Sequence, residues 1–197
     1  MAKKPKRKIA FSKAGVKEAA QGLMDLKKKI REIPDFPKKG ILFYDVTTLL
    51  KDAAALKYAV DKIIEHYPKQ KVKIDKVVSM ESRGFILGSI LAYKLQAGFV
   101  PIRKPGKLPA KTFTQEFEKE YGKDSFEVHE DAIEKGENVL IIDDLLATGG
   151  TAKATIELVK KLGGKIGGLT FLIELDLLKG REKLKDYDIF SLIHYDK

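Results

Sequence analysis

The chain has 197 residues, 44% of them hydrophobic, and it carries a formal net charge of +10 and no cysteine. This length fits one domain with a full-sized hydrophobic core, and the lack of cysteine excludes disulfides, thiolate metal ligands and a cysteine nucleophile. No apolar run approaches the ~20 residues of a membrane helix. The basic N-terminus is not followed by the apolar segment of a secretory signal, so we expect a cytoplasmic protein.

The positive charge is concentrated at the N-terminus. Residues 1–29 hold ten of the 38 Lys and Arg residues and two of the 28 acidic ones, so +8 of the net charge of +10 lies there. A uniformly basic nucleic-acid-binding face is therefore not indicated. We expect a basic extension over 1–29: a solvated tail to about residue 12, rather than a nuclear-import patch or polyanion contact, then an amphipathic helix over about 13–30. Residues 30–197 form one domain.

The hydrophobic pattern of that domain alternates between strands and helices. Strands are predicted at 41–46, 72–80, 99–103, 139–142, 165–175 and 188–194. Helices are predicted at 53–66, with Asp52 as N-cap, and at 85–95 and 151–162. Turns are predicted at 48–51, 81–84 and 179–182, and the polar, aromatic stretch 110–131 resembles a β-hairpin or mobile hood more than core. The alternation predicts an α/β fold with a mainly parallel central sheet flanked by helices.

The rest of the chain is organised around residues 139–162. Four apolar residues read as a strand buried on both faces, and Asp143 and Asp144 sit where that strand ends. A short loop then leads into a helix; it comprises Ala147, Thr148, Gly149, Gly150 and Thr151. Free N–H groups at a helix start favour a phosphate, while the two carboxylates can accept hydrogen bonds from hydroxyls such as those of a ribose.

This stretch resembles the 5-phosphoribosyl-1-pyrophosphate (PRPP) signature of type I phosphoribosyltransferases. Four further segments, 34–45, 81–85, 102–109 and 120–123, are similar to blocks of the adenine phosphoribosyltransferases, so the resemblance covers about residues 30–195. It implies the type I phosphoribosyltransferase fold with a small hood and a mobile loop. It also implies the conversion of PRPP and adenine to AMP and pyrophosphate, a homodimer, and Mg²⁺ bound through PRPP oxygens and waters rather than by protein ligands.

The resemblance also implies roles for individual residues. PRPP would be bound by Ser82, Arg83, Arg103, Lys104, Lys107, Asp143, Asp144, Ala147, Thr148, Gly149, Gly150 and Thr151. Glu120 would be the general acid/base on the purine, with Arg83 and Lys107 supporting the leaving pyrophosphate and Tyr121 closing over the site. Adenine would lie between Phe43 and Leu175 and be read by main-chain groups of Leu42 and Tyr44. The family carries a cis peptide at the position of Glu81-Ser82, and usually Arg where this chain has Tyr44.

Other functions are either excluded by the sequence or remain as alternatives. A Walker P-loop is excluded because the chain has no Gly-x-x-x-x-Gly-Lys-Ser/Thr segment, and the three histidines show no spacing typical of a zinc site or a catalytic triad. Transfer to xanthine, or to hypoxanthine and guanine, is the alternative within enzymes. A PRPP-sensing regulator of transcription is the alternative from another class, although residues 1–29 are too short for a winged-helix domain.

Overall fold

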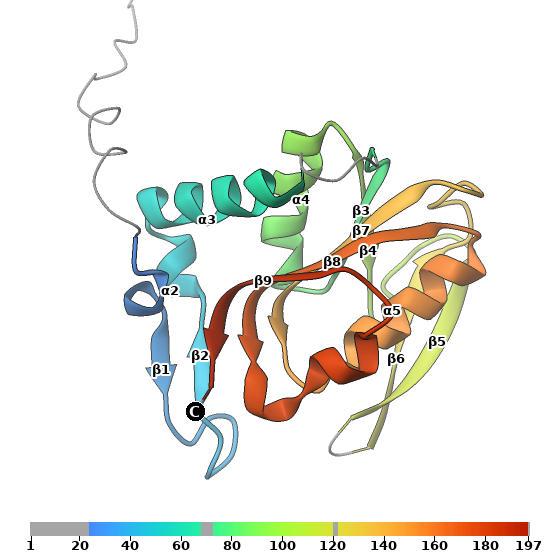
Figure 1. The fold of residues 1–197 in the computed structure, drawn as a ribbon. Helices are drawn as coiled ribbons and strands as arrows, with labels where there is room; N and C mark the ends of the chain where they lie inside the picture. Colours follow the sequence, from blue (N-terminus) through green and yellow to red (C-terminus); the bar gives the residue numbers. More distant parts are fainter. Residues whose placement is uncertain (1–23, 68–72, 120–121, 197) are drawn as a thin grey trace, which may run out of the picture.

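A five-stranded parallel sheet forms the centre of the protein in a computed structural model that describes residues 24–67, 73–119 and 122–196. The strand order is β4-β3-β7-β8-β9 (Figure 1). The strands are β3 (Lys76–Met80), β4 (Gly98–Ile102), β7 (Asn138–Leu146), β8 (Lys165–Leu175) and β9 (Ile189–Tyr195). Every neighbouring pair is parallel, as the alternating pattern predicts, and the run from Val139 lies in the middle strand.

Helices cover both faces of the sheet. Helices α3 (Ala53–His66) and α4 (Gly84–Leu95) lie on one face and α5 (Gly150–Lys161) on the other (Figure 1). Each face has its own cluster of buried apolar residues, so the sheet is covered on both sides. The Asp52 side chain accepts hydrogen bonds from the N–H groups of Ala54 and Ala55 at 3.0 and 3.1 Å, which confirms it as the N-cap of α3.

Two antiparallel pairs of strands lie outside the main sheet. Strands β1 (Arg31–Ile33) and β2 (Phe43–Asp45) form one pair, and β5 (Thr112–Lys119) and β6 (Gly122–His129) form the predicted hairpin. The expectation that this hairpin stands apart from the core is wrong. Phe117, Phe126 and Val128 are buried in the same cluster as the inner face of α5, because these apolar side chains alternate along strands that pack against the helix.

Two further sequence predictions need correction. The segment from Met24 to Ile30 is not an α-helix: a short 3-10 helix η2 (Leu26–Lys29) ends at an extended Ile30 that leads into β1, while residues 13–23 lie outside the described part of the chain. Strand β7 also continues four residues beyond Ile142, because its ladder with β8 runs on to Leu146. Asp143 and Asp144 therefore lie within the strand rather than after it.

The remaining elements are short. A single helical turn α2 (Thr47–Leu50) occupies the turn predicted at 48–51, and two 3-10 helices, η4 (Asp176–Leu178) and η5 (Gly180–Leu184), join β8 to β9. Within 24–67, 73–119 and 122–196, no helix is long and apolar enough to span a bilayer.

Candidate active site

A cavity of about 230 Å³ lies at the edge of the sheet where the parallel strands end. Ligands of open α/β sheets bind at this edge. The lining residues are Arg83, Phe117, Asp143, Asp144, Leu145, Ala147, Thr148, Gly149, Gly150 and Thr151. The paired aspartates and the complete loop predicted from the sequence thus border one cavity.

The loop predicted at 147–151 runs from the end of β7 into the first two residues of α5. Gly149 has φ +77°, in the left-handed region that favours glycine, and α5 begins at the next residue. A Cβ at Gly149 would lie 2.7 Å from the carbonyl oxygen of Gly180, so the position has no room for a side chain. The first N–H groups of α5 lack partners within the helix and can bind an anion in the cavity.

One cationic side chain, that of Arg83, contacts the Asp143–Asp144 pair near the C-terminal end of β7, and it does so through Asp144. Arg83 Nε lies 2.7 Å from Asp144 Oδ2, and Asp143 Oδ1 accepts the N–H of Asp144 at 2.9 Å. Burial, together with the negative charge of Asp144, raises the pKa of Asp143 well above the usual range of an aspartate. Burial also raises the pKa of Asp144, an effect that the Arg83 guanidinium opposes. The two carboxylates can therefore accept hydrogen bonds from hydroxyl groups. Their negative charge is only partly neutralised, and this lowers the stability of the folded protein.

Close packing at Gly84 brings Arg83 to the aspartates. A Cβ at Gly84 would lie 2.5 Å from Ser79 Oγ and 2.7 Å from Asp143 Oδ1, so a side chain there would displace the Ser79 hydroxyl or the Asp143 carboxylate. Ser79 Oγ in turn donates to the carbonyl oxygen of Ile142 at 2.9 Å. The Glu81-Ser82 peptide that precedes Arg83 is cis, which confirms the expectation from the resemblance.

Arg83 also connects the aspartates to the residues predicted to bind the base. Its guanidinium carbon lies 5.1 Å from the centroid of the Phe43 ring, a cation–π distance. The Tyr44 side chain points elsewhere, since it is 6% exposed and its ring centroid lies 4.0 Å from that of Tyr195. Leu42 is exposed, and Leu175 ends β8 half-buried.

The other predicted cations, Arg103, Lys104 and Lys107, are not among the residues that line the cavity. Arg103 Nε lies 2.8 Å from Glu81 Oε2, and Arg103 Nη1 donates to the carbonyl oxygen of Lys107 at 3.3 Å. This arrangement connects the turn at 104–107 to the Glu81-Ser82 peptide. Lys104 pairs with Asp124 on β6 and lies 5.4 Å from the centroid of the Phe126 ring, while Lys107 and Ser82 are exposed.

The hairpin β5–β6 contributes a residue that the sequence reasoning did not assign to the site. Phe117, 8% exposed, lines the cavity and packs on Phe126 with ring centroids 4.8 Å apart. The local sequence around Phe117, two residues before the end of β5, does not indicate this role, because the residues that it contacts are distant from it in the sequence. Glu120 and Tyr121 lie outside the described residues, between β5 and β6.

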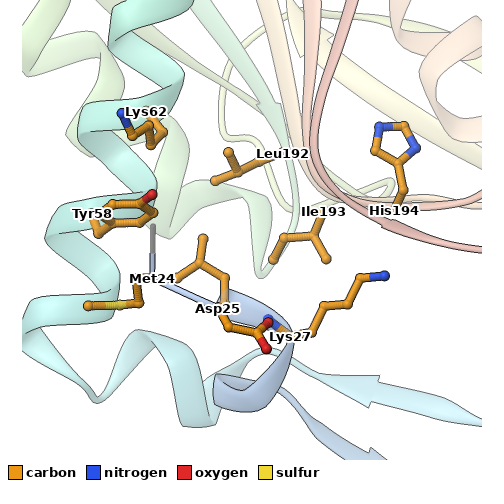
Figure 2. Close-up of a pocket in the computed structure, with 9 residues that line it drawn as sticks. Met24, Asp25, Lys27, Tyr58, Lys62, Leu192, Ile193 and His194 are labelled. Carbon is orange, nitrogen blue, oxygen red and sulfur yellow. The ribbon is translucent and has the colours of Figure 1, made fainter. Parts of the chain in front are cut away.

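A second cavity, of about 380 Å³, lies between η2, α3 and β9 (Figure 2). It shares no lining residue with the first. One of its residues, His194, belongs to a cluster with Glu174 and Asp176, and His194 Nδ1 lies 2.9 Å from Asp176 Oδ1. Both oxygens of Glu174 accept hydrogen bonds from Arg181, so this cluster is an ion-pair network rather than a metal site.

Comparison with known proteins places this fold and site in a family. The family model for the phosphoribosyl transferase domain matches residues 46–196, and the chain belongs to this family. Within it, the chain is 59% identical over 172 residues to the adenine phosphoribosyltransferase of Koribacter versatilis, covering 87% of this chain and 93% of that one.

Solved structures of adenine phosphoribosyltransferases are similar to this chain in fold as well as in sequence. The crystal structure of adenine phosphoribosyltransferase from Thermoanaerobacter pseudethanolicus matches with a TM-score of 0.83 at 53% identity, covering 87% of this chain and 98% of that chain. The enzyme from Saccharomyces cerevisiae, crystallised with adenine and an imino-altritol bisphosphate, matches with a TM-score of 0.82 at 44% identity, covering 85% and 96%. These matches bear out the predicted α/β fold and the predicted relationship.

Proposed function

We propose that this protein transfers the 5-phosphoribosyl group from PRPP to adenine, forming AMP and releasing pyrophosphate. The observation that carries the proposal is the single cavity in which Asp143, Asp144, Arg83 and the loop 147–151 meet. Anion-binding N–H groups and hydroxyl-binding carboxylates lie side by side there, as a sugar phosphate requires. The high identity to adenine phosphoribosyltransferases supports adenine as the acceptor.

In this proposal the sugar phosphate spans β7 and α5. The loop 147–151 binds the 5-phosphate through its N–H groups and the hydroxyls of Thr148 and Thr151. Asp143 and Asp144 hold the 2- and 3-hydroxyls. Bond breaking at the anomeric carbon runs ahead of bond making, with inversion, and the two carboxylates support the positive charge that develops on the ribose ring.

The pyrophosphate would leave toward the turn after β3. Arg83 lies at the start of α4, and Arg103 fixes the Glu81-Ser82 peptide through its contact with Glu81. Their positive charges, with those of Lys104 and Lys107, offset the charge that builds up on the leaving group. Mg²⁺ would be held by PRPP oxygens and waters rather than by protein ligands, and it would add to the neutralisation of the diphosphate. Two carboxylates beside an open cavity accommodate such a substrate-borne ion without a protein cage.

Adenine would stack on Phe43, where the guanidinium of Arg83 now lies. Main-chain groups of Leu42 and Tyr44 would match the donor at N6 and the acceptor at N1 of adenine. Guanine or hypoxanthine would leave a buried polar group unpaired, at a cost of about 1–3 kcal/mol. Because the Tyr44 side chain packs on Tyr195, it leaves this recognition to the backbone.

Glu120 is the proposed general acid/base on the imidazole ring of the purine as N9 attacks the ribose, and Tyr121 the residue that closes over the site. The family resemblance supports both roles. The hairpin β5–β6 supports a covering role for this segment, since Phe117 already borders the cavity. Such closure excludes water that would hydrolyse PRPP. A homodimeric state and a cytoplasmic location are proposed on the same resemblance.

A spectrophotometric assay with PRPP, Mg²⁺ and one base at a time tests the proposal. We expect turnover with adenine. With xanthine, hypoxanthine or guanine, kcat/KM should be at most about one-tenth of the value for adenine. This tenfold difference corresponds to the loss of about 1.4 kcal/mol or more that an unpaired polar group imposes. Equal or faster turnover of another purine would reassign the acceptor. Salt-dependent DNA binding without turnover of any purine would instead identify a PRPP-sensing regulator.

A further inference from the structure

The chain returns to the phosphate loop after β8, at a point that the resemblance does not assign to PRPP binding. Gly180, the first residue of η5, is buried against the loop backbone. A Cβ at Gly180 would lie 2.2 Å from the carbonyl oxygen of Ala147 and 3.0 Å from the backbone nitrogen of Gly149. The reverse also holds, because a Cβ at Gly149 would lie 2.7 Å from the carbonyl oxygen of Gly180. Two backbone segments thus contact each other with no side chain between them.

Arg181 fixes the position of Gly180. Its Nε and Nη2 donate to the two carboxylate oxygens of Glu174 at 3.0 and 2.6 Å, and its Nη1 donates to the carbonyl oxygen of Ile189 at 3.1 Å. Glu174 is 4% exposed within β8, and Ile189 begins β9. A bidentate pair of this kind holds orientation as well as charge. The Arg181 guanidinium therefore anchors η5, and with it Gly180, to strands β8 and β9.

We propose that Gly180 and Arg181 are positioning residues for the phosphate-binding loop. Arg181 holds η5 against the sheet, and Gly180 presents a flat backbone surface against which Ala147 and Gly149 rest. The loop N–H groups are thereby aimed into the cavity before a phosphate arrives. This inference rests on the proposed function, since it concerns the phosphate end of that same site.

The effect of a side chain at residue 180 follows from the geometry. Carbon and oxygen atoms in close contact lie about 3.3 Å or more apart, so a methyl group 2.2 Å from the Ala147 oxygen must displace one of the two segments by roughly 1 Å. A misplacement of ~1 Å in a binding constellation can reduce catalysis about 100-fold. The loss should fall on the phosphate end of the substrate and leave the base end intact.

The test compares Gly180→Ala with Gly164→Ala in the full-length protein. Gly164 is a matched control, because its Cβ would also meet a close neighbour, Val159 Cγ1 at 2.9 Å, but it lies just before β8 at the opposite edge of the sheet. The readouts are calorimetric affinity for ribose 5-phosphate, KM for PRPP, KM for adenine and kcat. Ribose 5-phosphate probes the loop without the diphosphate or the base.

We expect Gly180→Ala to weaken ribose 5-phosphate binding at least tenfold and to lower kcat/KM for PRPP about 100-fold, mainly through KM, with KM for adenine unchanged. Gly164→Ala should keep both ligand parameters even if its Tm falls. Wild-type affinity for ribose 5-phosphate in a folded Gly180→Ala variant would overturn the inference, as would a loss confined to kcat.

A second variant covers the case in which Gly180→Ala does not fold. Arg181→Lys keeps the positive charge but loses the fork that grips both oxygens of Glu174. It should raise KM for PRPP severalfold and leave KM for adenine unchanged, whereas unaltered kinetics with PRPP would overturn the role of Arg181. If the wild-type protein bound neither PRPP nor ribose 5-phosphate, the proposed function itself would be refuted. Failure of the proposed function is thus distinguishable from failure of the positioning role, which the variants test.

Discussion

Replacement of Asp143 by Asn should make the protein more stable and less active. The half-buried carboxylate of Asp143 lies beside the buried carboxylate of Asp144, and the Arg83 guanidinium contacts Asp144. Asn keeps the oxygen that accepts the N–H of Asp144 at 2.9 Å and removes only the charge. Relief of an under-compensated charge at this half-buried position contributes about 1 kcal/mol, and at most about 3 kcal/mol, to the free energy of unfolding. In a chain of this size, Tm rises by about 2–4 °C for each kcal/mol.

The gain should depend on pH. Because the pKa of Asp143 in the folded state lies above its ordinary value of 3.8, the folded protein retains a proton that the unfolded chain has released. Wild-type stability therefore falls as pH rises from 3.8 through the folded pKa, and the Asn variant escapes this loss. The advantage of the variant should be absent near pH 3.8 and complete above the folded pKa.

Thermal unfolding across this pH range, together with steady-state kinetics, measures both effects. Loss of a carboxylate that stabilises developing positive charge should lower kcat about 100–1,000-fold. Asp144→Asn is the matched control: it leaves Arg83 without its partner, so its gain in stability should be smaller. An Asp143→Asn variant with a Tm at or below that of the wild type at neutral pH would refute the reasoning about charge at this site.

Three further outcomes are expected. Glu120→Gln should lower kcat far more than it raises KM for PRPP in steady-state assays, and a near-normal kcat would remove Glu120 from the mechanism. Asp45→Asn should lower the free energy of unfolding by about 1–2 kcal/mol at neutral pH, because hydrogen bonds from Thr47 and Arg31 hold the pKa of Asp45 at about 2. Denaturant titrations should show that difference shrinking as pH falls from the ordinary pKa of 3.8 toward 2; a constant difference would contradict the assignment. Tyr44→Phe should keep the KM for adenine and the choice of base, since the ring packs on Tyr195, and a changed preference among purines would show that the hydroxyl contacts the base.

Local sequence signals were sufficient for much of the fold. Strand β8 has the bounds 165–175 that its apolar run predicts, with Gly163 and Gly164 before it, and helix α3 begins after the predicted cap at Asp52. The phosphate loop was equally accessible, because its strand, acids, glycines and helix are contiguous. Such features depend on neighbours within a few residues along the chain, so the sequence displays them directly.

Features that depend on distant partners could not be read in this way. Strand β7 continues past Asp143 because β8 offers partners as far as Glu174, and a polar residue gives no local sign of that ladder. The contact of Gly180 with Ala147 joins segments more than thirty residues apart. The pairing of Lys104 with Asp124 likewise follows from the hairpin placed beside β4, which charge patterns alone do not specify.

Calorimetric titration of the protein with PRPP in the presence of Mg²⁺ tests the central claim most directly. Binding at the cavity formed by the loop 147–151 and Asp143 predicts one saturable site per chain, and it predicts weaker binding when Asp143 and Asp144 are both replaced by Ala. A folded wild-type protein that gives no binding heat at any temperature tested, or a double variant that binds PRPP as tightly as the wild type, would contradict the account.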